Sequence, residues 1–313
     1  MKVNRLVLTS DLLRVANPIH KHEVIANHTK WMHKVLHQTI KYATRKELEI
    51  VEWEHGSSFD GDEVYALLGM PSVVESWIEL YYQKEVPKEI TDYFSPFFKD
   101  SLVIGFEISP FMIQIFKQLD VPCINLMWDP VRFMDDIFFC FTTNTPSIFE
   151  RLVAYQLPQI LIYQTADLLR ARFLRQNPRF DIEGVIIFGQ TKVDRSLIKN
   201  TYLKKLEDYA AQIQALQQFG QIFFKPHPFD LESEARTAFF NQLQMQTLRG
   251  EYNTYDLLCS EQIKHVAAIS SGTLIEAVFF EKPSSMFNQG YYHFHSETPT
   301  FSTQQSIAVF NEF

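Results

Sequence analysis

The sequence lacks the residue patterns that define several classes of protein. Its three cysteines, Cys123, Cys140 and Cys259, show no spacing typical of metal ligands, and two of them lie in apolar runs. We therefore expect reduced thiols in an intracellular compartment and no metal site. The chain also lacks an excess of positive charge, since its formal net charge is -8. This balance argues against a surface that binds nucleic acid and against a strongly polybasic membrane anchor, although it leaves room for a local basic groove.

Long hydrophobic runs are missing as well. The first apolar run stops at Ser10 and Asp11, whereas a membrane-spanning helix needs about 20 apolar residues, so a cytoplasmic location is expected. No internal repeat or low-complexity segment interrupts the pattern. What remains is a chain of 313 residues that is 46% hydrophobic and 21% charged. Such a chain is typical of a folded protein with room for two domains.

Two apolar runs in the second half predict strands of a parallel α/β sheet, because each leads into a polar loop and a helix start. The first run, QIFFKPHPFD, places Lys225 and His227 in its loop. The second, HVAAISSGTLIEAVFF, places a group of small residues at a helix start: Ser270, Ser271, Gly272 and Thr273. Loops at the carboxyl edge of such a sheet bind ligands. The pair of loops therefore predicts a phosphate-binding site.

A third strand and loop are predicted to share that edge. In GVIIFGQTKVDRSLI, the strand Val185 to Phe188 precedes a loop from Gln190 to Asp194 and a helix expected from Arg195 to Phe219. Asp194 is either the N-cap of that helix or a residue of the site. Glu276 either accepts the hydroxyls of a nucleotide ribose or completes a capping box with Thr273.

The first half predicts a second parallel sheet. A strand from Arg5 to Leu8 ends near Asp11, which is a candidate base or acceptor contact, or a helix cap. The strand Ser101 to Phe106 leads to Glu107, and the strand Val121 to Met127 leads to Arg132 across an intervening helix. Glu107 and Arg132 should therefore lie at neighbouring strand ends. They would either bind a sugar acid, whose carboxylate suits a bidentate arginine, or pair with each other.

Smaller signals complete the expected organisation. Asp60 and Asp62 predict a turn with a helix cap, and Asp135 and Asp136 predict a helix start. A mainly helical pattern from Pro146 ends at Asn177 and Pro178, which is a stop signal. We therefore expect two Rossmann-like domains, residues 1–178 on the acceptor side and residues 179–313 on the nucleotide side.

Five segments together resemble bacterial glycosyltransferases of the GT-B type that use CMP-activated sugar acids, in particular the β-Kdo transferases of capsule and lipopolysaccharide synthesis. The segments are IGFEISP, WDPVRFMDD, FGQTKVDRSLI, FFKPHP and SSGTLIEA. They span Gly105 to Glu281, whereas the first hundred residues match only as a general GT-B domain. Trp128 and Asp129 depart from the family pattern, which has a histidine or small polar residue before the proline.

The resemblance implies retaining transfer of a 2-keto sugar acid, most specifically Kdo, from CMP to a bacterial surface glycan. It implies that Asp194 is the nucleophile, that His227, Ser270 and Ser271 hold the CMP phosphate, and that Glu107 is an acid or base. The CMP-sugar is then a co-substrate, and no cofactor is expected. The implied acceptor is a glycan or a lipid-linked glycan, which would bring the protein to the inner face of the inner membrane.

The implied chemistry is consistent with the residues. Lys225 and His227 can stabilise the negative charge of departing CMP, and a carboxylate at Asp194 can capture an oxocarbenium-like centre. Two alternatives stay open. One is an inverting transferase of sialic-type nonulosonic acids, or a polyol-phosphate transferase, with Asp11 as base. The other is a non-catalytic GT-B protein that binds a nucleotide or a glycan.

Overall fold

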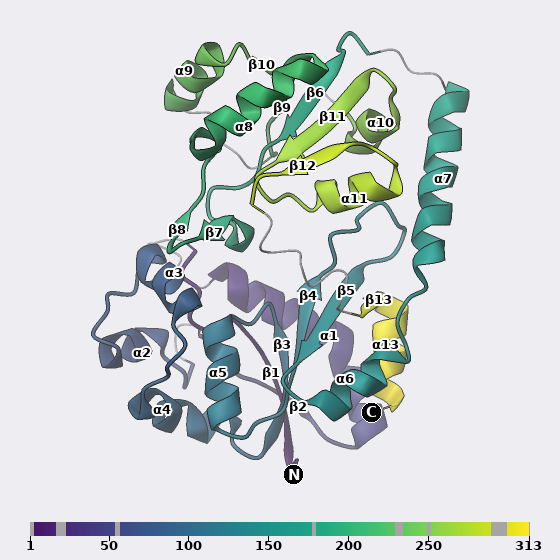
Figure 1. The fold of residues 1–313 in the computed structure, drawn as a ribbon. Coiled ribbons are helices and arrows are strands. Elements are labelled where there is room, and N and C mark those ends of the chain that lie inside the picture. The colour runs from purple at the N-terminus through teal and green to yellow at the C-terminus, as the bar shows by residue number, and fades with distance from the viewer. Residues whose placement is uncertain are drawn as a thin grey trace. The chain divides into compact units, whose positions relative to one another are not determined.

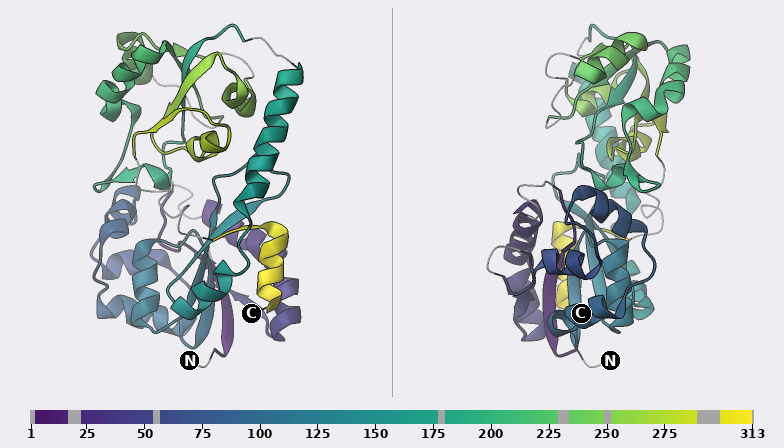
Figure 2. Two further views of the ribbon diagram at one scale, coloured as in Figure 1. Left: turned by 45° about the vertical axis from the view of Figure 1, so that its right-hand side comes forward. Right: turned by 90° about the vertical axis from the view of Figure 1, so that its left-hand side faces the viewer.

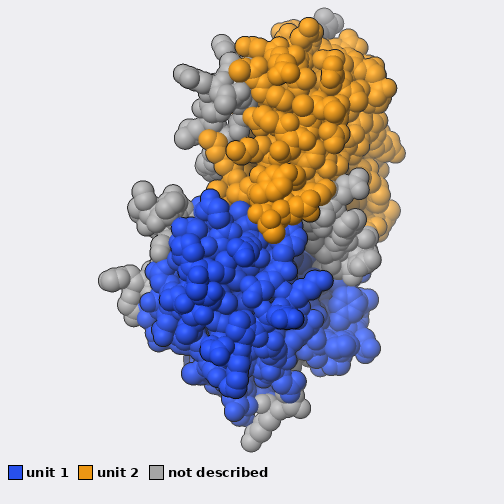
Figure 3. All heavy atoms as spheres, turned by 60° about the vertical axis from the view of Figure 1, so that its left-hand side comes forward, with its two compact units in different colours: residues 1–129, 136–157, 297–313 blue, residues 130–135, 158–296 orange. Residues whose placement is uncertain are grey.

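The computed structural model describes residues 3–16, 23–53, 57–176, 180–228, 234–248, 252–288 and 299–312. They form two compact units, which Figure 3 colours separately. Unit 1 contains residues 1–129, 136–157 and 297–313, and unit 2 contains residues 130–135 and 158–296. Each unit is built around its own sheet, so the predicted architecture of two Rossmann-like α/β units is confirmed.

The sheet of unit 1 has six strands in the order β13-β5-β4-β3-β1-β2. Neighbouring strands are parallel from β2 to β4, and β5 and β13 are added antiparallel. The bounds are β1 (Arg5–Ser10), β2 (Leu48–Ile50), β3 (Ser101–Phe106), β4 (Cys123–Trp128), β5 (Phe138–Thr143) and β13 (Thr300–Ser302). The predicted crossover from β3 to β4 is present, with α5 (Pro110–Gln118) between them.

Helices cover both faces of this sheet (Figure 2). On one face, Leu6 and Leu8 of β1 pack in a cluster with Met32 and Leu36 of α1. Val7 of β1 is also fully buried, as expected for a strand covered on both sides. The remaining helices of unit 1 are α1 (Glu23–Thr44), α2 (Gly61–Leu67), α3 (Val74–Tyr82), α4 (Lys88–Phe98), α6 (Pro146–Val153) and α13 (Thr303–Glu312).

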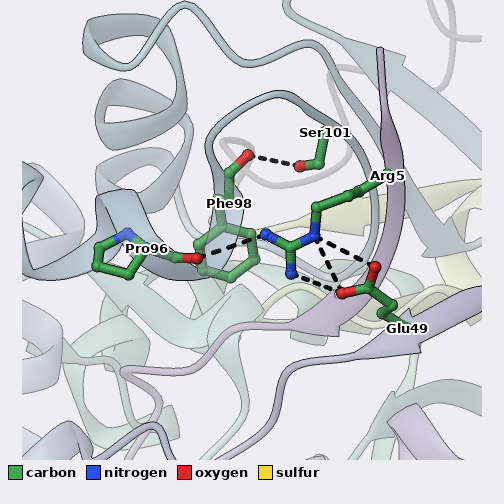
Figure 4. A network of polar contacts seen from close by, with 5 residues as sticks. All are labelled: Arg5, Glu49, Pro96, Phe98 and Ser101. Carbon is green, nitrogen blue, oxygen red and sulfur yellow. Dashed lines mark hydrogen bonds and ion pairs between the residues drawn. The ribbon is translucent and has the colours of Figure 1, made fainter.

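A polar network fixes the amino ends of β1, β2 and β3 (Figure 4). The guanidinium of Arg5 donates to the carboxylate of Glu49, with 2.6 Å between Nη2 and Oε2, and also to the carbonyl of Pro96. The hydroxyl of Ser101 donates to the carbonyl of Phe98 at 2.6 Å. This network fixes the amino ends of these strands. The candidate residues Asp11 and Glu107 follow β1 and β3 at the opposite, carboxyl end.

The sheet of unit 2 has the order β10-β9-β6-β11-β12, and all four strand pairs are parallel. Its strands are β6 (Gly184–Phe188), β9 (Gln221–Lys225), β10 (Gln246–Thr247), β11 (Ile263–Ala268) and β12 (Ser284–Met286). Its helices are α7 (Gln159–Gln176), α8 (Ala210–Ala215), α9 (Glu234–Gln242), α10 (Thr254–Cys259) and α11 (Thr273–Phe279). The three strands predicted for this sheet, β6, β9 and β11, are therefore direct neighbours.

Two helix predictions are corrected. The helix expected from Arg195 to Phe219 is broken, because Asn200 and Thr201 both have positive φ and form the turn of a short hairpin. The segment contains the 3-10 turn η1 (Arg195–Leu197), β7 (Ile198–Lys199), β8 (Tyr202–Leu203), η2 (Leu206–Tyr209), α8 and η3 (Leu216–Phe219). No helix begins at Asp135 and Asp136; the Asp136 carboxylate instead accepts from the N–H of Ile137 at 2.7 Å, just before β5.

The two units divide the chain differently from the predicted boundary at residue 178. Helix α7 belongs to unit 2, where Tyr163 packs on Phe279 at 4.9 Å between ring centroids and Arg170 pairs with Glu281 at 2.9 Å. The last described segment, β13 with α13, belongs to unit 1, because β13 extends the sheet beyond β5. Neither assignment could be predicted from the sequence, because α7 and β13 each pack on residues that are far from them in the chain.

Within the described ranges, none of the helices combines the length and apolar character needed to cross a bilayer.

Candidate functional site

Three loops of unit 2 leave the carboxyl ends of adjacent parallel strands. They follow β9, β6 and β11, which lie side by side in the sheet. The register aligns the strand ends, because Phe188 of β6 is the partner of Lys225 of β9, and Ile187 is the partner of Ala267 of β11. Carboxyl ends of parallel strands are the usual ligand-binding edge of an α/β sheet. The predicted gathering of these loops on one edge is therefore present.

A hydrogen-bonded cluster joins two of these loops. Gln190 Nε2 donates to the hydroxyls of Ser196 and Ser270, each at 3.1 Å, and Gln190 Oε1 accepts from the N–H of Ser270 at 2.8 Å. The Ser270 hydroxyl donates to that of Ser196 at 2.9 Å. Asn288, which follows β12, donates to the Ser196 carbonyl at 3.1 Å. Ser270 is fully buried, so the cluster fixes the β6 loop against the β11 loop.

Asp194 is held next to this cluster. Its Oδ1 accepts from the N–H of Ser196 at 2.8 Å and caps the 3-10 turn η1, as the N-cap interpretation predicts. Its Oδ2 makes no hydrogen bond to any residue that the structure describes. One oxygen thus fixes the orientation of the side chain, and the other can face a ligand.

The loop after β9 approaches the loop after β6 very closely at Gly189. The N–H of Gly189 donates to the carbonyl of Lys225 at 2.8 Å, and a Cβ on Gly189 would lie 2.9 Å from the backbone N of His227. Only glycine fits such an approach. Lys225 is half-buried, and burial lowers the pKa of its ammonium group. His227 is also partly buried. The backbone contacts of Gly189 therefore bring Lys225 and His227 beside the start of the loop that carries Asp194.

The segment Ser271 to Thr273 satisfies part of its own backbone. The hydroxyl of Ser271 accepts from the N–H of Thr273 at 3.3 Å, and the carbonyl of Gly272 accepts from the N–H of Glu276 at 3.1 Å. Within the described part of the chain, the N–H groups of Ser271 and Gly272 make no hydrogen bond. The donors available to an anion are therefore these two groups.

Glu276 is not part of a capping box. Its side chain is 2% exposed, and Oε1 accepts from the backbone N–H of Arg132 at 2.6 Å and from the Tyr255 hydroxyl at 3.1 Å. Burial raises the pKa of the Tyr255 hydroxyl, and the neighbouring Glu276 carboxylate adds to the rise, so Tyr255 remains a donor. Glu276 thus anchors the segment 130–135 to α11 and leaves the side chain of Arg132 exposed.

Arg132 and Glu107 belong to different units, so each is held by its own neighbours. Glu107 Oε2 pairs with Nη1 of Arg14 at 3.4 Å in unit 1. Its φ of 51° lies in the left-handed region, which costs a non-glycine residue about 1 to 2 kcal/mol. Burial lowers the pKa of His28, and the Glu107 carboxylate partly opposes this. Arg14 in turn lies over the ring of Trp77 at 5.4 Å.

Asp11, the candidate base of the alternative reaction, is 2% exposed. Its Oδ1 accepts from the Ser109 hydroxyl at 3.0 Å and its Oδ2 accepts from the indole N–H of Trp77 at 3.1 Å. No helix begins within the described residues that directly follow it, 12–16, so the helix-cap interpretation does not hold. Both oxygens of Asp11 are occupied in tying β1 to α3 and α5.

The two residues that depart from the family pattern have packing roles in unit 1. Trp128 stacks on Phe139 at 5.1 Å between ring centroids. Asp129 is fully buried, and its Oδ2 accepts from the Cys140 thiol and the Thr300 hydroxyl, both at 2.9 Å.

Potential metal ligands are dispersed in the described residues, which contain no group of three or more His, Cys, Asp or Glu side chains that could hold a metal ion. Asp60 accepts from the N–H of Asp62 at 2.9 Å and caps α2, as predicted.

Sequence reasoning missed several residues that build these sites: Arg14, Ser196, Tyr255 and Asn288. Ser196 lies two residues after Asp194 in the quoted FGQTKVDRSLI segment, and that proximity was the available signal. The partners of the other three lie far away in the chain, so no local pattern pointed to them.

Comparisons with known proteins add little to this geometry. A scan against protein-family models found no match, and a search of curated proteins found none. Among solved structures, Thermosulfurimonas dismutans KpsC, a beta Kdo 2,7 transferase, is similar over 73% of this chain and 90% of its own, with 14% identity and a TM-score of 0.42. A glycosyltransferase from Rickettsia africae is similar over 90% of this chain and 79% of its own, with 11% identity and a TM-score of 0.34. Such distant likeness assigns no activity, so the function is argued from the residues.

Proposed function

We propose that the protein is a CMP-sugar-dependent glycosyltransferase that moves a 2-keto sugar acid, specifically Kdo, to a bacterial surface glycan with retention of configuration. The observation that carries the proposal is the Gln190–Ser196–Ser270 cluster. It fixes the loop of Asp194 against the segment of Ser271. A carboxylate whose Oδ2 has no hydrogen bond to the described residues is thereby held at the same sheet edge as the backbone N–H groups of Ser271 and Gly272. Covalent transfer from a phosphate-activated sugar needs both a nucleophile and donors for the phosphate.

In this proposal, the unit 2 loops bind the CMP phosphate. The backbone N–H groups of Ser271 and Gly272 donate to it, and Lys225 and His227 neutralise the charge that grows as CMP leaves. Ser270 has a supporting role, because its hydroxyl is already bonded to Ser196. The exposed guanidinium of Arg132 receives the carboxylate of the sugar acid.

Asp194 then acts as the nucleophile. Its Oδ2 attacks the anomeric carbon, the bond from that carbon to the CMP phosphate oxygen breaks, and the electron pair leaves with CMP. In the second step, the acceptor hydroxyl attacks the same carbon, gives its proton to a general base and releases Asp194 as a carboxylate. Two inversions at one carbon give net retention. The scheme assigns no role to a metal.

The Glu276 carboxylate is given a positioning role rather than a contact with ribose. Its Oε1 already accepts from the Arg132 N–H and the Tyr255 hydroxyl. It therefore sets the place of the arginine that receives the sugar acid.

Intact-protein mass spectrometry tests the covalent mechanism. With CMP-Kdo and no acceptor, wild-type protein should gain the mass of one Kdo residue, and Asp194→Asn should gain none. Release of CMP without any mass gain would reject the covalent route and favour an inverting reaction. Tight binding of CMP without release from any donor would instead support a non-catalytic binding protein.

The pH dependence of CMP affinity tests the role of Lys225. Burial lowers the pKa of its ammonium group, so the positive charge is lost as the pH rises through a value below the ordinary 10.5. The phosphate monoester of CMP is already a dianion above about pH 7. Affinity measured by calorimetry should therefore fall about tenfold on the alkaline side, at a lower pH than an exposed lysine would give. Lys225→Met should bind weakly with a flat profile, and the exposed Lys199→Met should behave like wild type. A wild-type profile in Lys225→Met would contradict the assignment.

A further inference from the structure

Helix α7 carries apolar side chains on two opposite faces. Its inner face, made of Ile162, Ala166 and Phe173, is buried. Figures 1 and 2 show this helix beside α10 and α11 of the same unit. Burial of one face explains why the helix folds against unit 2. It does not explain the apolar residues that point the other way.

The opposite side, which we call the α7 outer face, consists of Ile160, Leu161, Leu168, Arg172 and Arg175. All five are exposed, and the three apolar side chains are exposed by 59%, 43% and 71% in that order. Leu161, Leu168 and Arg175 recur every seven residues, which is close to two turns of an α-helix, so they form one stripe. Large apolar side chains in a row on one exposed stripe indicate an interaction surface.

The charge of the α7 outer face is opposite in sign to that of the whole chain. Its only formal charges are the guanidinium groups of Arg172 and Arg175, whereas the chain carries a net charge of -8. The acidic residue at its edge, Asp167, is paired with Arg170 at 3.5 Å, and Arg170 also bonds Glu281. The face thus combines apolar side chains with unbalanced positive charge.

We propose that the α7 outer face docks on an anionic lipid surface. On such a surface, exposed leucines enter the boundary between head groups and acyl chains, and neighbouring arginines contact the anionic head groups. Charged residues prevent α7 from spanning the bilayer, in line with the finding for the described helices. If two copies of α7 paired through the α7 outer face, the arginines of each copy would lie against apolar side chains of the other. Those arginines would then have no carboxylate to pair with. The inference is independent of the donor proposed above.

Vesicle co-sedimentation tests this directly and needs no enzyme assay. The full chain is mixed with phosphatidylcholine vesicles that contain about 30% phosphatidylglycerol, or none. We expect binding to the anionic vesicles and at least about tenfold weaker binding to the neutral ones. Arg172→Gln with Arg175→Gln should weaken binding by about 25-fold, since each arginine contributes about fivefold. Leu161→Gln with Leu168→Gln should abolish it even at low salt.

Matched controls come from exposed residues of unit 1. Leu67 is 47% exposed on α2 and Lys99 is exposed after α4, so Leu67→Gln and Lys99→Gln should bind vesicles like wild type. Circular dichroism should show native helix content in every variant. Equal binding of wild type and the leucine variant would overturn the proposal. So would a dimer in sedimentation that the same variants dissociate without any vesicle binding, because a second copy would then be the occupant.

Discussion

Replacing Asp194 with asparagine should lower the rate of sugar transfer by about 10⁴-fold or more, because the amide cannot form the glycosyl ester. The substitution removes the nucleophilic carboxylate but keeps the structural contact, since an asparagine oxygen can still accept the Ser196 N–H and keep the turn capped. Initial rates with CMP-Kdo and a bacterial surface-glycan acceptor provide the measurement. CMP affinity should remain close to that of wild type, so the defect should appear in kcat and not in donor binding.

Asp208 offers a matched control in the same unit. Its Oδ2 accepts from the N–H of Lys205 at 2.9 Å and caps the exposed 3-10 turn η2. Asp208→Asn changes the same chemical group, which also accepts a backbone N–H at the start of a 3-10 turn, without touching the site, so transfer should be unaffected. If Asp194→Asn retained a tenth or more of the wild-type rate, Asp194 would be a capping residue and not the nucleophile.

Replacing Asp129 with alanine should destabilise unit 1 by about 3 kcal/mol. The carboxylate is fully buried and accepts from the Cys140 thiol and the Thr300 hydroxyl. Its removal leaves buried donors without acceptors and opens a cavity. Urea unfolding followed by tryptophan fluorescence isolates the effect, because all four tryptophans, Trp31, Trp53, Trp77 and Trp128, lie in unit 1.

An exposed aspartate of the same unit is the comparison. Asp92 pairs with Lys88 on the surface of α4, where both side chains are largely exposed. Asp92→Ala should therefore change the unfolding free energy by about 0.5 kcal/mol or less. A similar small effect in Asp129→Ala would show that the buried network contributes little to unit 1.

Much of the fold could be predicted because its strands are continuous apolar runs. The run Ser101 to Phe106, the helix after Pro110 and the next run could only be a parallel crossover, and the structure contains it. The error in the helix predicted from Arg195 to Phe219 could not be recognised from the sequence. Its apolar residues fit a helical period, and the left-handed turn at Asn200 and Thr201 is set by the hairpin it closes.

The sequence could predict which types of residue gather in the candidate site, but not which hydrogen-bond partners they have. Lys225, His227 and Ser271 were placed at one sheet edge because each follows an apolar run. The bond from Gln190 to Ser270 spans 80 residues in sequence, and it depends on β6 and β11 being neighbours. The sequence also could not reveal that the carboxylate of Glu276 is committed to the backbone of Arg132.

The position of β13 in unit 1 has a consequence for folding during synthesis. Residues 158–296 of unit 2 leave the ribosome before β13 and α13, which complete unit 1. Until Thr300 emerges, the edge of β5 has no strand to cover it, and the buried carboxylate of Asp129 lacks the hydrogen bond from the Thr300 hydroxyl. Unit 2 can therefore fold first on the nascent chain. Unit 1, whose first strands are synthesised before unit 2, is therefore completed last. While unit 2 is being translated, the uncovered edge of β5 can pair with strands of other chains.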